Sequence, residues 1–182
     1  MGKVVVCHAT IGAIVICLVA SAHASNTNSL ACLQRAHSSS VSVQRQFQRN
    51  LQRLVESNRP DLAGAAAAGA ATQMAYFDVI EARFAYLVRT QPKRIEGVIR
   101  PNGAAVVFDW TDADTAALSR ADPQYEQVEV KWVHLRTQTE RHPDRSHLLD
   151  YIQSSQDFRA LSMRFVRQHR VVKDILEQCR TP

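Results

Sequence analysis

The chain has 182 residues, 46% of them hydrophobic, and its 22 lysines and arginines against 17 acidic residues give a formal net charge of +5. This length suits one domain and is sufficient to bury a hydrophobic core. The chain has six glycines but no glycine-rich phosphate loop, and it contains no G-x-S-x-G or H-E-x-x-H motif, so the usual signatures of nucleotide-binding proteins, serine hydrolases and zinc proteases are excluded.

The N-terminus has the pattern of a secretory signal peptide. Lys3 precedes an apolar run from Val4 to Ala20, and Ala22-His23-Ala24 supplies a small-x-small cleavage site. We expect residues 1–24 to be a signal peptide, and residues 25–182 to form a single helical domain in the periplasm or outside the cell. The alternative is a retained membrane anchor, but the apolar run is only just long enough to span a bilayer. No later segment is apolar enough to be an integral membrane span.

Cysteine usage follows from this cleavage site. Removal of the signal peptide would take away Cys7 and Cys17 and leave Cys32 and Cys179. In an oxidising compartment two cysteines have only one pairing. A zinc site is the alternative, but these two thiols lack a zinc-ligand spacing. We therefore predict a Cys32–Cys179 disulfide, for which the chain-entropy model gives an upper limit of about 5 kcal/mol.

Two long helices are expected in the first half of the mature chain. Over residues 28–57, apolar side chains recur at three- and four-residue spacing between glutamines and arginines, which is the period of an amphipathic helix. Pro60 follows a break in this pattern and is well placed in the first turn of a second helix, over about 61–90. Pro92 ends that helix.

The middle of the chain predicts shorter elements. Residues 97–107 contain two β-branched runs around a Pro-Asn-Gly turn, a pattern typical of a short β-hairpin. Thr111 and Asp114 form a capping-box pattern that predicts a short helix to about Arg120. The hairpin would be marginally stable unless it packed on helices.

Two further helices complete the chain. Asp122 and Pro123 supply a cap and a first-turn proline for one helix, which Pro143 ends. The last helix is expected over about 146–179, because apolar residues recur there at seven-residue intervals. This repeat consists of Tyr151, Phe158, Phe165, Val172 and Cys179.

Together these elements predict an all-α protein. We expect an antiparallel helical bundle of about four to five helices, with a short β-hairpin near 97–107, closed by one disulfide. Cys179 lies on the apolar side of the last helix, and Cys32 lies near the start of the first. The disulfide would therefore place these two helices side by side.

Positive charge is concentrated on the first and last helices. Three arginines of the first helix, Arg45, Arg49 and Arg53, are four residues apart, so they follow one face. The candidate residues for binding an anion or a partner are Arg45, Arg49, Arg53, Arg164, Arg167 and Arg170. The segment 109–129 is the reverse, with six acidic residues and one arginine.

This charge pattern has two interpretations. In the first, the basic first helix lies near the acidic segment 109–129, and the other charges are solvated surface. In the second, the paired basic helices bind an acidic protein or an anionic envelope polymer. A nucleic-acid partner is not expected after export, since the basic face lacks interleaved aromatic residues for base stacking. The sequence leaves the oligomeric state open.

The loop 141–147 contains residue types that ligate metals. His142, Asp144 and His147 are weak candidates, because a short loop with one carboxylate has no specific metal-ligand spacing. We expect neither a metal nor a cofactor. The residues His142-Pro143-Asp144-Arg145 resemble the HPD loop of J-domain cochaperones, which joins two antiparallel helices and implies an Hsp70 partner. The resemblance covers this loop alone.

Candidates for catalysis are few. His37 and His169 fall on or near apolar helix faces, where a histidine is more often a core residue with a hydrogen-bonded ring than a base. The sequence therefore predicts a protein that binds rather than catalyses. The alternative is a small helical-bundle enzyme that acts on an anionic metabolite through arginines directed into the bundle.

Overall fold

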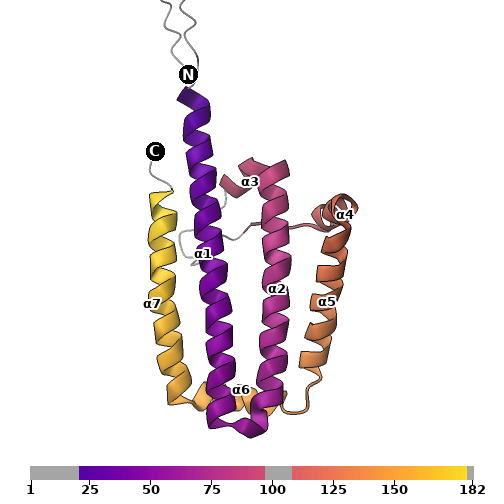
Figure 1. The fold of residues 1–182 in the computed structure, drawn as a ribbon, viewed down its shortest axis with the longest axis vertical. Helices are drawn as coiled ribbons and strands as arrows, with labels where there is room; N and C mark the ends of the chain where they lie inside the picture. The colour runs from indigo at the N-terminus through magenta and orange to yellow at the C-terminus, as the bar shows by residue number, and fades with distance from the viewer. Residues whose placement is uncertain (1–20, 97–107, 180–182) are drawn as a thin grey trace, which may run out of the picture.

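The computed structural model describes residues 21–96 and 108–179, and this part of the chain is helical apart from its connections (Figure 1). The elements are α1 (Ser21–Asn58), a 3₁₀ turn (Pro60–Leu62), α2 (Ala63–Thr90), α3 (Pro92–Glu96), α4 (Asp112–Ala121), α5 (Pro123–Glu140), α6 (Arg145–Ser154) and α7 (Gln156–Gln178). The all-α class is confirmed for the described residues. The hairpin predicted near 97–107 lies outside them.

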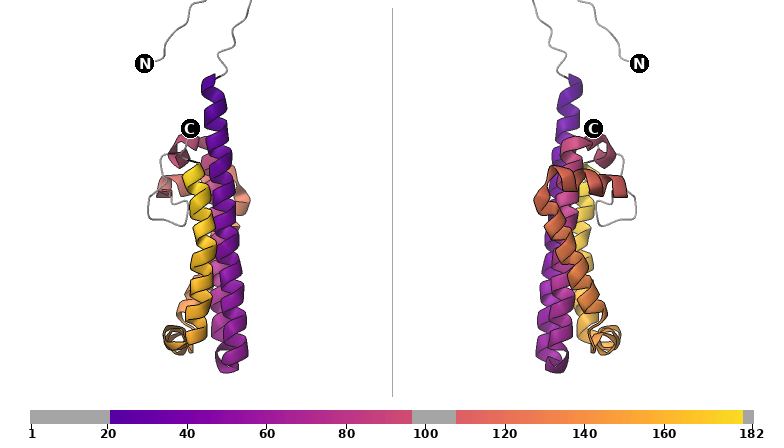
Figure 2. Two further views of the ribbon diagram at one scale, coloured as in Figure 1. Left: turned by 90° about the vertical axis from the view of Figure 1, so that its left-hand side faces the viewer. Right: turned by 90° about the vertical axis from the view of Figure 1, so that its right-hand side faces the viewer.

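The four long helices pack in the order α7, α1, α2 and α5, each antiparallel to its neighbour (Figure 1). α1 and α2 therefore lie at the centre, each between two long helices. The short helix α6 lies across the end of the molecule where α1 turns into α2, as the side views also show (Figure 2). α3 and α4 lie toward the opposite end (Figure 1).

Cys32 and Cys179 are bonded across the α1–α7 interface. Their Sγ atoms are 2.06 Å apart and their Cα atoms 5.5 Å apart, the disulfide pairing that the sequence predicts. Cys179 belongs to the larger apolar cluster, together with Leu33 of α1 and Leu176 of α7. A smaller cluster of Val55, Leu62 and Ala66 forms the core at the other end of the molecule.

The predicted caps in the middle of the chain are confirmed. Thr111 Oγ1 accepts a hydrogen bond from the Asp114 backbone N at 3.2 Å, and Asp114 Oδ2 accepts one from the Thr111 backbone N at 3.0 Å, which completes a capping box. Asp122 Oδ1 accepts from the Gln124 backbone N at 3.0 Å, with Pro123 in the first turn of α5.

The prediction of one continuous helix over about 146–179 is wrong. α6 ends at Ser154 and α7 begins at Gln156, because Ser155 has an extended backbone and its Oγ accepts a hydrogen bond from the Phe158 backbone N at 3.1 Å. The break separates Tyr151, on α6, from the rest of the seven-residue repeat on α7.

Asn58, the last residue of α1, donates hydrogen bonds to both α6 and α7. Its Nδ2 donates to Tyr151 Oη of α6 at 3.3 Å and to Asp157 Oδ2 of α7 at 2.9 Å. No helix within the described ranges is sufficiently long and apolar to cross a membrane.

Candidate functional site

Arg45 is the first of the predicted arginines, and it faces α2. Its Nη2 atom lies 2.7 Å from Asp78 Oδ1 and 2.6 Å from Glu81 Oε2. Partial burial opposes the charge, but the hydrogen bonds to Asp78 and Glu81 outweigh it and raise the pKa of Arg45. The charge of Arg45 is therefore balanced by two carboxylates of α2.

Arg49 and Arg53 lie further along α1 and are exposed. Arg53 Nη2 donates to Asn50 Oδ1 at 2.5 Å, and its Nε donates to the Arg49 carbonyl at 3.4 Å. Neither arginine forms an ion pair with a carboxylate of the described chain. Their positive charge is directed to solvent.

A groove of about 500 Å³ runs between α1 and α7, and this is where the two basic helices meet. Arg53 lines it from α1 and Arg164 from α7. The remaining lining residues are Phe47, Asn50, Leu54, Ser57, Leu161, Phe165 and Gln168. The structure thus brings one predicted arginine from each helix to a partly aromatic groove, here called the α1–α7 groove.

The solvent side of α7 continues this basic surface. Arg164, Arg167 and Arg170 are all exposed, and none is ion-paired within the described part of the chain. Two large apolar side chains stand among them, Met163 at 65% and Val166 at 59% exposure. A mixture of arginine and exposed apolar side chains is typical of protein–protein interfaces.

Two carboxylates of the acidic segment 109–129, those of Asp114 and Glu129, do not pair with arginines of the first helix. Asp114 instead binds Arg94 of α3 through two hydrogen bonds, Nη1 to Oδ1 at 2.8 Å and Nη2 to Oδ2 at 3.0 Å. Glu129 Oε1 of α5 accepts from Arg83 Nη2 of α2 at 2.7 Å.

These two pairs also bear on the enzyme alternative, which needs arginines free inside the molecule. Arg83 lines a cavity between α1 and α2, but it is bound to Glu129 and to Tyr125 Oη, the latter at 2.8 Å. A second anion would have to displace the protein carboxylate.

His142, Asp144 and His147 do not gather into a metal site. No group of three or more potential ligands forms among the described residues. His142 Nδ1 accepts a hydrogen bond from the Asp144 backbone N at 3.2 Å, and the His142 ring covers Gly64. The pair His147 Nδ1 and Asp144 Oδ1 is 3.9 Å apart on the surface. The loop that resembles the HPD loop thus joins α5 to α6, with its histidine packed on α2.

The two histidines expected in the core are buried, at 5% and 6% exposure. The expectation that their rings are fully hydrogen-bonded is wrong, since His37 Nε2 and His169 Nδ1 have no hydrogen-bond partner within the described residues. Burial lowers the pKa of His37 to about 4 and also lowers the pKa of His169. Both rings pack on phenylalanines instead, His37 on Phe84 and His169 on Phe165.

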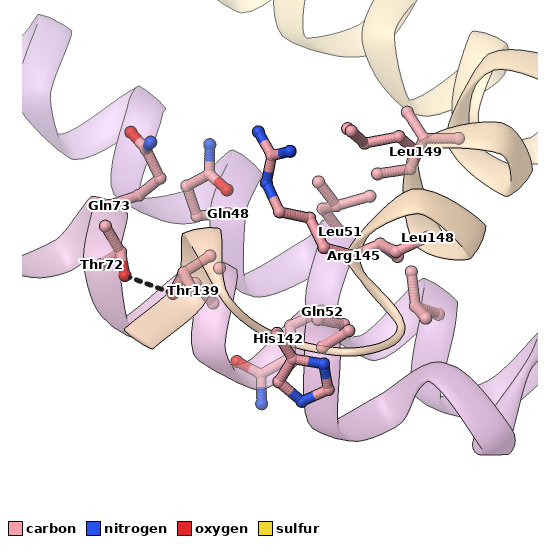
Figure 3. Close-up of a pocket in the computed structure, with 16 residues that line it drawn as sticks. Gln48, Leu51, Gln52, Thr72, Gln73, Thr139, His142, Arg145, Leu148 and Leu149 are labelled. Atoms are coloured by element: carbon pink, nitrogen blue, oxygen red, sulfur yellow. Dashed lines mark hydrogen bonds between the residues drawn. The ribbon is translucent and has the colours of Figure 1, made fainter. Parts of the chain in front are cut away.

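A third hollow is not predicted by the sequence patterns. It is a cavity of about 260 Å³ bounded by α1, α2, the α5–α6 connection and α6 (Figure 3). Ala65, Gly69 and Ala70, from the alanine and glycine run at the start of α2, form one wall of this cavity. The small side chains were the available signal, because they leave room wherever the facing helix does not approach closely.

Comparisons with protein-family models, curated proteins and solved structures gave no match to this chain.

Proposed function

We propose that the mature chain is an exported protein that binds an acidic protein partner through the outer faces of α1 and α7. One observation carries the proposal: Arg53 and Arg164 line the same groove, and neither is paired with a carboxylate of the described chain. Arg45, two turns earlier on α1, has two carboxylate partners. The sequence therefore neutralises one arginine of this helix and leaves others for a partner.

The surroundings of these arginines favour a protein over a uniform polyanion. Phe47 and Phe165 line the α1–α7 groove, and Met163 and Val166 stand exposed beside it. Arginine, methionine and aromatic residues are the types enriched in protein interfaces, and apolar contacts would add nothing to the binding of a phosphate or sulfate polymer.

The scaffold supports binding by holding the arginines in place. The Cys32–Cys179 bond and the hydrogen bond from Asn58 to Asp157 link α1 to α7 near the two ends of their interface. A surface that is already ordered loses less entropy when it binds. We also propose that residues 1–24 are a signal peptide and that the disulfide forms after export, in the periplasm or outside the cell.

The test uses the non-reduced mature chain and two fluorescent probes, poly-L-glutamate and polyphosphate. The double variant R53Q/R164Q is compared with R120Q/R141Q, which loses the same charge from exposed positions outside the groove. Fluorescence anisotropy should show poly-L-glutamate binding at least tenfold weaker for R53Q/R164Q and unchanged for R120Q/R141Q. Equal weakening of both variants, or a preference for polyphosphate, would contradict the proposal.

Export is tested separately. Mass spectrometry of the protein recovered outside the cytoplasm should give a chain that begins at Ser25 and is two mass units lighter than its reduced form. A chain that still carries residues 1–24 would contradict the signal-peptide assignment.

A further inference from the structure

The cavity beside α6 is a concave, largely apolar site on the opposite side of α1 from the α1–α7 groove. The same stretch of α1 serves both hollows: Leu51 and Val55 face this cavity, whereas Phe47 and Leu54 face the groove. Leu148, Leu149 and Ile152 of α6 form another wall of the cavity. With about 260 Å³ it is close to the lower end of the range for small-molecule sites, roughly 300 Å³.

The lining of this cavity includes one arginine and no lysine. Arg145, the first residue of α6, lines it and forms no ion pair with any described residue. Figure 3 shows its guanidinium on the same side of the cavity as the amides of Gln48 and Gln73, with His142 on the other side. The hydroxyls of Thr72 and Thr139 are bonded to each other at 2.8 Å, so they are already engaged (Figure 3).

We propose that this cavity binds the acyl chain of a medium-chain fatty acid, with the carboxylate held by Arg145. The apolar walls supply a favourable environment for methylene groups, and a guanidinium beside neutral amides is complementary to a single carboxylate. The lining holds no acidic residue, so nothing in it repels an anion or attracts a cation. The size of the cavity admits one chain rather than a helix of a partner protein.

Gly69 makes the inference directly testable. It lines the cavity, and a Cβ atom added at this residue would meet nothing within 4 Å. A leucine there would therefore fill the ligand space without a backbone clash. Because glycine is a poor helix former, the substitution should also preserve or raise the stability of α2.

The first experiment measures chain-length dependence by isothermal titration calorimetry, with hexanoate, octanoate and decanoate added to the full mature protein. Each methylene that enters the cavity should tighten binding about fourfold, until the chain outgrows the space. Octanol, which has the same chain without the charge, should bind at least tenfold more weakly than octanoate. Absence of octanoate binding at millimolar concentration would overturn the proposal.

The second experiment separates the cavity from its cation. G69L should abolish octanoate binding, with G69M as a second blocking variant and circular dichroism as the check on folding. R145Q should remove the preference for octanoate over octanol, whereas R141Q, an exposed arginine outside the cavity, should retain it. Octanoate binding that survives both blocking variants would place the ligand elsewhere and overturn the proposal. Binding that is unchanged in R53Q/R164Q would show that this site is independent of the α1–α7 groove.

Discussion

The imidazole of His37 stacks on the ring of Phe84, with the ring centroids 3.8 Å apart and the planes 15° apart. This position leaves His37 Nε2 without a hydrogen-bond partner among the described residues and lowers the pKa of the ring to about 4 through burial. The stacked ring is therefore neutral at physiological pH. Protonation would place an unpaired charge between α1 and α2.

A pH dependence of stability follows from this ring. In the unfolded chain the pKa of His37 is near the ordinary histidine value of 6.5, so between pH 6.5 and about 4 the unfolded state binds a proton that the folded state excludes. The free energy of unfolding should fall by about 2–3 kcal/mol as the pH drops across that window. Urea unfolding at a series of pH values measures it.

The variant H37F is the control for this effect, because it keeps the stacked aromatic ring and removes the titrating group. Its pH dependence should be smaller than that of the parent protein, with the remainder due partly to His169, whose pKa is also lowered by burial. An unchanged slope in H37F would rule out His37 as the source.

Asp114 controls stability at a lower pH. The Arg94 guanidinium, together with the hydrogen bonds from Thr111, holds the pKa of Asp114 well below its ordinary value of 3.8. The stabilisation is therefore complete above pH 3.8 and is lost as the pH falls through the lower folded-state pKa. D114N should reduce the free energy of unfolding at pH 7 by about 2 kcal/mol, since a charge-assisted pair and half of the capping box are lost.

The matched control for Asp114 is D112N, an exposed aspartate in the same first turn of α4. Thermal unfolding should show a loss below about 1 kcal/mol for this variant, because only its interaction with the helix dipole changes. Equal effects of D112N and D114N would mean that the contact with Arg94 contributes nothing.

The disulfide closes most of the chain, since its cysteines are 147 positions apart in the sequence. Replacing both cysteines by serine should lower the free energy of unfolding by about 2–4 kcal/mol, mainly because the unfolded chain gains conformational freedom. Urea titrations of the parent protein with and without dithiothreitol provide the comparison. The reduced parent protein should match C32S/C179S, and an unshifted midpoint in both would contradict the prediction.

Ser155 sets the break between α6 and α7 through its hydrogen bond with the Phe158 backbone N. S155A should cost about 1 kcal/mol, the usual loss for an N-cap. S154A is the neighbouring control, because Ser154 Oγ only donates back to the Asp150 and Tyr151 carbonyls of its own helix and its removal should be nearly neutral. Chemical denaturation of the two variants distinguishes the cap from a general effect of losing a hydroxyl.

The sequence alone determined the features that depend on neighbouring residues. Helix periodicity predicted the long helices, and the Thr111–Asp114 capping box and the Asp122 cap were readable because their partners lie within three residues. The disulfide was also predictable from the sequence, since cleavage of the expected signal peptide would leave only two cysteines. The Ser155 cap was present in the sequence too, but the seven-residue repeat across it predicted one continuous helix.

Only the tertiary structure decided which charges remain unpaired and where space is left. Arg45, Arg49 and Arg53 share the same four-residue spacing. Of these three, only Arg45 forms ion pairs, because Asp78 and Glu81 lie opposite it on α2. Likewise, Asp114 and Glu129 of the acidic segment pair with Arg94 of α3 and Arg83 of α2. The cavity beside Arg145 depends on how closely α6 approaches α1 and α2, and that distance is set by packing between helices remote in sequence, which local periodicity does not encode.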